Sequence, residues 1–252
     1  MTRARCVAFV ARLRRQVGGI STMEFALGMP LLLGFGGYGV EMSNLAITNM
    51  RISQYALQVA DNASRIGVNS GLATFQLREG DINDVIQGLR LFSAGSHLTQ
   101  FGRVTISSLE NIQQSYADGN GNDTAPVQRI HWQRCIGQRG GDADPGFDSS
   151  YGTTNVNAAS PASGDLPTQA NAGTDKPGGM GETGQEINAP EGMGVIFVEV
   201  NYQYQPLFGT LFVNPTKLHY TASVIVRDKR DFRQIYNPSP TAVASTCDRH
   251  TA

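Results

Sequence analysis

Glu24 is the residue whose position most demands a chemical explanation, because it lies at the head of an apolar run that extends to Val40. Moving a carboxylate into bilayer hydrocarbon costs at least about 2.5 kcal/mol, so a glutamate there is a candidate functional residue that needs a partner. A peptidase cut between Gly19 and Ile20 would create one. The new α-amino group of Ile20, on this chain or on a neighbouring copy, would lie one helical turn from Glu24. The alternative is an uncleaved anchor whose Glu24 snorkels to headgroups or water.

Residue types that support catalysis or metal binding occur without a recognisable pattern elsewhere. No serine or cysteine lies in a known nucleophile motif, and the histidines lack the spacing of metal ligands. We therefore expect no catalytic residue, no metal, no cofactor and no enzymatic activity. The four histidines are His97, His131, His219 and His250.

The three cysteines suggest a single intrachain disulfide. Cys6 precedes the predicted cut, so Cys135 and Cys247 would be the pair left in an exported domain, where disulfides persist. Closing so long a loop would stabilise the fold by about 4 to 5 kcal/mol in the chain-entropy treatment. Two free thiols and an intermolecular bridge are the alternatives.

The amino-terminal residues predict one membrane span with a fixed orientation. The leader, residues 1–19, contains five arginines and no acidic residue, and such basic segments stay on the cytoplasmic side. Residues 20–40 match one bilayer thickness of helix. Pro30 lies inside this span, where it either kinks the helix for assembly or is a tolerated membrane proline.

The segment 14–33, RRQVGGISTMEFALGMPLLL, resembles the amino-terminal signature of the TadE-like pilus assembly proteins, the minor pseudopilins of the tight-adherence (Tad/Flp) system. The resemblance consists of a basic leader, a glycine five residues before a Glu-Phe pair, the tetrad Glu-Phe-Ala-Leu and a proline six residues after the glutamate. It covers about the first quarter of the chain, with weaker similarity at 202–208 and 220–227.

This resemblance implies cleavage by a prepilin peptidase after Gly19, which makes Ile20 the first mature residue. Glu24, Phe25 and Pro30 are then the assembly residues. The implied partners are the bacterial inner membrane, the peptidase, other pilin and pseudopilin subunits and the Tad secretion apparatus. The implied location is the inner membrane, with a single pass, a cytoplasmic amino terminus and a periplasmic or extracellular carboxyl-terminal domain.

Beyond the membrane span, periodicity predicts an α+β fold, and the resemblance implies that this fold is pilin-like. Apolar residues seven apart indicate that the helix continues as a stalk over 41–66, and a shorter helix is expected over 81–92 with Asp81 as its N-cap. Strands are expected where β-branched and aromatic residues gather, forming a small antiparallel sheet on the stalk helix. Their ranges are 103–109, 127–136, 194–204 and 217–227, within one exported domain made of 67–136 and 194–233.

Two segments are expected to lie outside this core. Residues 137–193 are rich in Gly, Ser, Thr, Asn, Asp and Pro, which predicts a long flexible loop that is either a tolerated insertion or a contact surface. Residues 234–252 are expected to form a loose tail.

The net charge and the basic leader bear on three possible functions: nucleic-acid binding, a minor pilin and a membrane-tethered module. Without the five leader arginines, 15 basic residues face 21 acidic ones, which argues against nucleic-acid binding. We expect a membrane-anchored minor pilin. The alternative is an uncleaved, single-pass, membrane-tethered binding or sensing module outside the cytoplasm.

Overall fold

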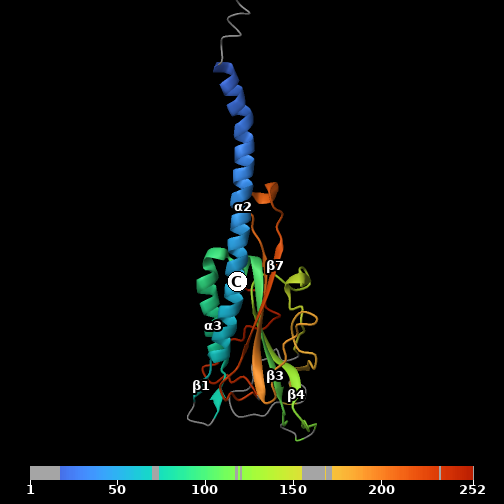
Figure 1. The fold of residues 1–252 in the computed structure, drawn as a ribbon. Helices are drawn as coiled ribbons and strands as arrows, with labels where there is room; N and C mark the ends of the chain where they lie inside the picture. Colours follow the sequence, from blue (N-terminus) through green and yellow to red (C-terminus); the bar gives the residue numbers. More distant parts are fainter. Residues whose placement is uncertain are drawn as a thin grey trace, which may run out of the picture. The chain divides into compact units, whose positions relative to one another are not determined.

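The chain divides into two compact units. The anchor unit comprises Met1–Ala46 and Gln205–Pro215, and the sheet unit comprises Ile47–Tyr204 and Thr216–Ala252. Helix α2 belongs to both units, and a five-stranded antiparallel sheet forms the centre of the sheet unit, so the predicted α+β class is confirmed (Figure 1). The computed structural model describes residues 18–69, 74–116, 119, 121–154, 168, 172–232 and 234–251.

Helix α2 runs without interruption over Gly18–Arg65 and contains Pro30. The predicted membrane span 20–40 and stalk 41–66 are therefore parts of one helix. By length and composition, α2 is the one helix among the described residues that could cross a membrane. Its end is fixed by Arg230, whose guanidinium donates hydrogen bonds to the carbonyls of Ser64 and Ile66 at 3.1 and 2.6 Å. A cation at this position also complements the negative end of the helix dipole.

The sheet has the strand order β5-β4-β3-β6-β7, and each neighbouring pair is antiparallel. The four long strands agree with the predicted ones to within three residues at each end. Strand β5 is two residues long and lies in the segment for which we expected no secondary structure. The bounds are β3 Gly102–Ile112, β4 Val127–Ile136, β5 Thr174–Asp175, β6 Met193–Gln203 and β7 Lys217–Ile225.

The carboxyl-terminal part of α2 and helix α3, Glu79–Ser93, cover one face of this sheet (Figure 1). The apolar stripe of α2 is buried there as predicted, with Ile52, Ala56, Val59 and Ala63 almost inaccessible to solvent. Polar contacts reinforce the packing, since the hydroxyl of Tyr220 in β7 donates to Asn49 of α2 at 3.1 Å. Burial of this stripe is the main stabilising contribution of the helix layer.

Helix α3 begins two residues earlier than predicted. Asp81 is not its N-cap. Its carboxylate instead accepts a hydrogen bond from the backbone N–H of Arg78 at 3.1 Å, from inside the first turn. The predicted apolar face is confirmed, and it is buried through Ile82, Val85, Ile86 and Leu89. Small elements surround α3: β1 Val68–Asn69, β2 Phe75–Gln76, the 3-10 turn Ala94–Ser96 and α4 Leu98–Phe101.

The segment between β4 and β6 lies on the opposite face of the sheet (Figure 1, yellow to orange). For its described residues, the prediction of a flexible loop without a buried surface is wrong. Tyr151, Met180 and Ala189 pack in one buried cluster with sheet residues that include Ile130 and Phe197. Residues 155–167 and 169–171, which the prediction also included, lie outside the described part.

The glycine-rich, polar composition of this segment allows it to pack closely on the sheet, whereas we expected it to keep the segment flexible. Polar side chains of the sheet bind its backbone: Gln133 donates to the carbonyl of Gly152 at 2.9 Å, and Glu199 accepts from the N–H of Ser150 at 3.0 Å. Gly173 has a φ of +100°, and a Cβ there would lie 2.7 Å from the carbonyl oxygen of Ile130. Glycine therefore permits the close approach of the segment to β4.

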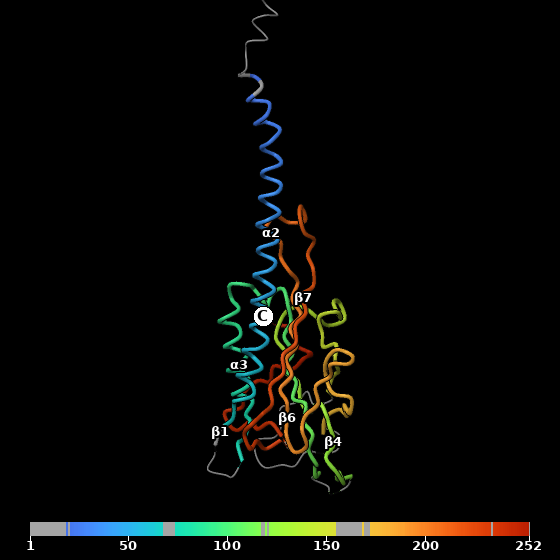
Figure 2. Tube along the Cα trace, in the orientation of Figure 1, coloured from blue at the N-terminus to red at the C-terminus, as the bar shows by residue number. Residues whose placement is uncertain are grey.

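The carboxyl-terminal segment is also packed, contrary to the expected loose tail. Ile235 and Tyr236 are buried, and the N–H of Tyr236 donates to the carbonyl of Leu77 at 2.8 Å. Further along, the N–H of Cys135 at the end of β4 donates to the carbonyl of Ser245 at 2.8 Å. Figure 2 shows this segment, in red, passing among the elements of the sheet unit. The hydrogen bond of Cys135 and the one from the N–H of Gly137 to the carbonyl of Thr251 hold the tail beside the end of β4.

Candidate functional site

The predicted processing and assembly residues all lie in the first turns of α2. Gly19, Glu24 and Pro30 are exposed, and Phe25 exposes 66% of its surface. The helix already includes Gly18 and Ile20, so Ile20 and Glu24 are separated by one helical turn, as the sequence predicted. The arginines of the leader lie outside the described residues.

The carboxylate of Glu24 is chemically unpaired within the described part of the chain. No side-chain hydrogen bond or ion pair joins it to another described residue. Around it the helix exposes large apolar side chains, including Met23, Leu27 and Leu31. An exposed apolar helix with one open carboxylate can bind a cationic group on a partner.

A second carboxylate lies at the other end of the apolar segment, and it is fully paired. Glu41 is inaccessible to solvent and accepts hydrogen bonds from the backbone N–H groups of Leu207 and Phe208 at 3.3 and 3.1 Å. Glu41 is the first residue after the predicted span, and the sequence predicted no partner for it. The signal for its partner was the uncharged, apolar stretch 206–213 between two strands.

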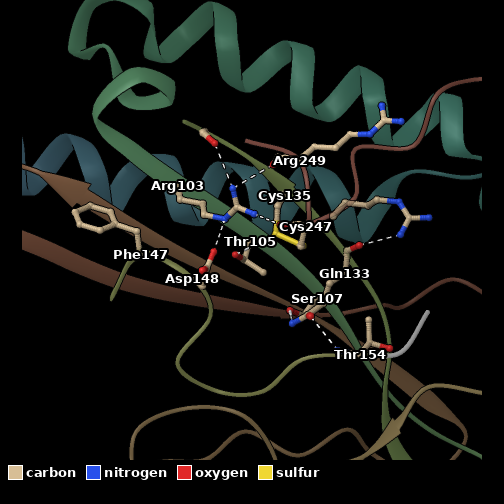
Figure 3. Close-up of a disulfide and its surroundings, with 12 residues drawn as sticks. Arg103, Thr105, Ser107, Gln133, Cys135, Phe147, Asp148, Thr154, Cys247 and Arg249 are labelled. Atoms are coloured by element: carbon tan, nitrogen blue, oxygen red, sulfur yellow. Dashed lines mark hydrogen bonds and ion pairs between the residues drawn. A yellow bond between two sulfur atoms is a disulfide. The ribbon is translucent and has the colours of Figure 1, made fainter. Parts of the chain in front are cut away.

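The candidate cysteine pair is joined in the structure (Figure 3). Cys135 in β4 and Cys247 in the tail form a disulfide across a sequence separation of 112 residues. The bond reinforces the position of the tail, which the backbone of β4 already holds. The function of these cysteines in the sheet unit is therefore structural.

Arg103 is the central polar residue around this disulfide, and sequence reasoning missed it (Figure 3). Its side chain is inaccessible to solvent, forms an ion pair with Asp148 at 3.0 Å and donates to the carbonyls of Cys247 and Arg249. Burial lowers the pKa of Arg103, and the neighbouring Asp148 partly offsets this. One guanidinium thus joins β3, the segment after β4 and the tail. The alternation of β3 places Arg103 on the polar face with Thr105 and Ser107, which would predict exposure, so the sequence signals neither its burial nor its partners.

A second buried ion pair joins the helix layer to the sheet. Arg134 of β4 donates to both carboxylate oxygens of Glu79 at 2.7 Å, and both side chains are fully buried. Bidentate pairing of this kind satisfies both charges in a site without solvent. The pair fixes the first turn of α3 against the sheet.

The most enzyme-like cluster surrounds Tyr151 on the loop-covered face. Its hydroxyl donates to Glu182 at 2.6 Å and lies 2.8 Å from Nε2 of His219, whose Nδ1 is 2.7 Å from Asn201. Burial, and next the hydrogen bond to Glu182, raise the pKa of Tyr151, so the hydroxyl stays protonated at neutral pH. The cluster therefore links the loop to the sheet and contains no activated nucleophile.

A cleft of about 820 Å³ opens beside this cluster. Charged side chains of both signs line it, among them Lys176, Glu182, Glu186 and Lys217. Within the described ranges, no group of three histidine, cysteine, aspartate or glutamate side chains could hold a metal ion. The cleft can accept a polar ligand with charged groups of either sign.

Comparison of the chain with protein-family models, with curated proteins and with solved structures found no match. The functional conclusion consequently depends on the residues and their geometry.

Proposed function

We propose that this chain is a membrane-anchored minor pilin, a pseudopilin, that takes part in assembly of a Tad/Flp-type adhesive pilus. The observation that carries the proposal is the open carboxylate of Glu24 at the head of an exposed apolar helix, five residues after Gly19. A free-standing anchor has no use for a charge in this position. A subunit that meets the amino group of Ile20 on itself or on a neighbour has a direct use for it.

The exposed surface of α2 supports the same proposal. Leucines and phenylalanines on several sides of the helix between Met23 and Val40 lie open to the surroundings. So large an apolar surface requires lipid or protein around it. Bilayer lipid covers it before assembly, and other subunits cover it in the filament.

The sheet unit supports export from the cytoplasm. Its disulfide between Cys135 and Cys247 is a type of bond that persists in oxidising compartments and is rare in the cytosol. A basic leader on the cytoplasmic side and a disulfide-bonded domain on the other side are consistent with one membrane crossing. In this proposal the partners are the inner membrane, the prepilin peptidase, other subunits and the Tad secretion apparatus.

The decisive experiment is to determine the mature amino terminus in cells with an active prepilin peptidase. Intact mass of the membrane-extracted protein is expected to correspond to a chain that begins at Ile20. Gly19→Val is expected to block the cut, because the peptidase must fit a residue without a side chain. Gly28→Val is the matched control, since a Cβ at Gly19 or at Gly28 would meet no atom within 4 Å of its own subunit. A mature protein that retains Arg3 to Arg15 would overturn the proposal.

The cleft beside Tyr151 favours one other function, an uncleaved membrane-tethered binding module. Its charged lining suits a small polar ligand with groups of both signs. If the chain is such a binding module, its leader should remain intact, and its ligand binding should be unchanged by Glu24→Gln. Mature-terminus mapping therefore discriminates between the two functions.

A further inference from the structure

The connection between β6 and β7 is unusually long and has no charge. Thirteen residues, 204–216, separate the two strands, whereas hairpin connections usually have two to five. From Gln205 to Pro215 the connection contains no acidic or basic residue. It belongs to the anchor unit together with the membrane-compatible part of α2.

Two kinds of contact hold this connection on α2. Glu41 binds its backbone through the N–H groups of Leu207 and Phe208, as described above. The ring of Phe212 packs over Gly37, where an added Cβ would lie 2.8 Å from the ring, and meets Tyr38 edge-on with 6.4 Å between ring centroids. The ring of Phe212 can occupy this position because residue 37 has no side chain.

The outer side of the docked connection is apolar. Leu207, Phe208 and Leu211 expose 59%, 45% and 74% of their surfaces. Phe35, Tyr38 and Val40 of the helix are likewise exposed, and Tyr38 contacts Phe212 of the connection. The contacts at Gly37 and Glu41 place this surface at the end of the predicted span.

From these observations we infer that residues 205–215 form a membrane-interface collar that inserts Leu207, Phe208 and Leu211 into the boundary between lipid headgroups and acyl chains. Aromatic and apolar side chains accumulate at this depth in membrane proteins. The carboxylate of Glu41 is compatible with it because two backbone donors replace water. The proposal requires that α2 spans a membrane, and it does not require that the chain is a pilin.

Lipid fits the collar better than a second copy of the chain. The contacts of Phe212 with Tyr38 and at Gly37 hold the exposed apolar side chains of the connection beside those of the helix, so one bilayer can cover both. A second copy placed on the collar alone would leave the adjoining helix surface uncovered. The stretch 205–215 also contains no charged side chain that could contribute to the polar rim of a protein interface.

The test measures the depth of the collar by fluorescence quenching. The full chain carrying Cys6→Ser and Leu211→Cys is labelled with bimane and reconstituted in phosphatidylcholine and phosphatidylglycerol vesicles. Cys135 and Cys247 do not react because they form the disulfide. The matched control carries the label through Val243→Cys, another exposed apolar position, located in the sheet unit. Brominated phosphatidylcholine reports contact with lipid, and iodide reports contact with water.

Brominated lipid is expected to quench the label at position 211 several-fold more than the label at position 243, and iodide is expected to show the opposite order. Equal quenching by brominated lipid at the two positions would overturn the proposal. Protection at position 211 that appears only at high protein-to-lipid ratios would identify a second copy as the occupant, which would also overturn it.

Glycine variants then test how the collar is held. Gly37→Ala must displace Phe212 and is expected to reduce lipid quenching at position 211 by more than half. Gly39→Ala is the matched control, because a Cβ there meets no atom within 4 Å, and it should leave quenching unchanged. Glu41→Gln is expected to act like Gly37→Ala, since its amide group turns a donor toward one of the two N–H groups. Equal values for both glycine variants would overturn the docking of the collar on Gly37.

Discussion

Two glutamates, Glu79 in the sheet unit and Glu24 in the anchor unit, lie in opposite environments. In the sheet unit Glu79 is fully buried, and Arg134 binds both of its oxygens. In the anchor unit Glu24 is exposed on an apolar helix and has no side-chain partner among the described residues. The sheet unit thus satisfies the charge of Glu79 within one chain, whereas the charge of Glu24 has no side-chain partner among the described residues and is, in our proposal, available to another molecule or to a newly formed terminus.

Glu41 shows that this difference is not a general property of the anchor unit. It lies on the same helix as Glu24, yet it is buried and accepts two backbone hydrogen bonds. The anchor unit can therefore satisfy a carboxylate when its own chain passes nearby. The open state of Glu24 is specific to its position, and this supports a role in assembly.

The largest effect on folding is expected from opening the disulfide of the sheet unit. Cys247→Ser should destabilise the sheet unit by about 4 to 5 kcal/mol, because it releases a closed loop of more than 100 residues. Denaturant unfolding of the full chain in detergent, followed by the fluorescence of the single Trp132, measures this loss. A change below about 1 kcal/mol would mean that the backbone contacts of the tail alone suffice.

A slightly smaller loss of folding stability is expected when one partner of the buried ion pair between Arg134 and Glu79 is removed. Arg134→Met leaves Glu79 buried without its partner and should cost about 3 to 5 kcal/mol. The control is the double variant Glu79→Met with Arg134→Met, which removes both charges and should recover much of this stability. If the single and the double variant were equally unstable, packing and not the unpaired charge would be the cause.

A moderate, pH-dependent effect is expected at Asp123, which is mostly buried beside Arg129. The hydrogen bonds from Arg129, at 2.6 and 2.8 Å, lower the pKa of Asp123. A lowered folded-state pKa stabilises the protein above the unfolded-state pKa of about 3.9, and this contribution is lost as the pH falls through the folded value. Asp123→Asn should therefore cost about 1 to 3 kcal/mol at neutral pH.

The same variant provides its own control at low pH, where Asp123 is protonated in both states. The difference in unfolding free energy between Asp123→Asn and the parent chain should shrink as the pH is lowered below about 3.9. A difference that stayed constant with pH would show that the charge of Asp123 contributes little.

The smallest effect on folding and the largest on assembly are expected at Glu24. Glu24→Gln keeps the size of the side chain and should leave the sheet unit unchanged, while incorporation into pili falls about tenfold or more. Limited proteolysis, cell fractionation and a count of surface pili separate these outcomes. Glu24→Asp, which keeps the charge, should restore part of the assembly.

Two results would contradict the proposed role of Glu24, which distinguishes it from the paired glutamates. Normal piliation with Glu24→Gln as the only copy would leave Glu24 without a role in assembly. Loss of the variant protein from the membrane fraction would show that Glu24 serves insertion.

Local patterns were sufficient for the elements with strong periodicity. The apolar run, the seven-residue repeat in α2 and the β-rich segments predicted the long helix and the four long strands, because burial of one face imposes its period on the sequence. The pairing of Cys135 with Cys247 was the expected one among three alternatives, because a leader cysteine leaves only two others.

The positions of the polar and glycine-rich segments could not be predicted from the sequence and became known from the three-dimensional packing. The 137–193 segment looked unable to bury a surface, yet its glycines allow close approach to β4, and buried polar side chains of the sheet bind its backbone. Arg103 and Glu41 each bind backbone groups more than 100 residues away along the chain, at Arg249 and at Leu207. Such contacts leave no local period in the sequence, because each depends on where two distant backbones meet. Composition therefore determined which segments are polar, and packing determined which of them are ordered.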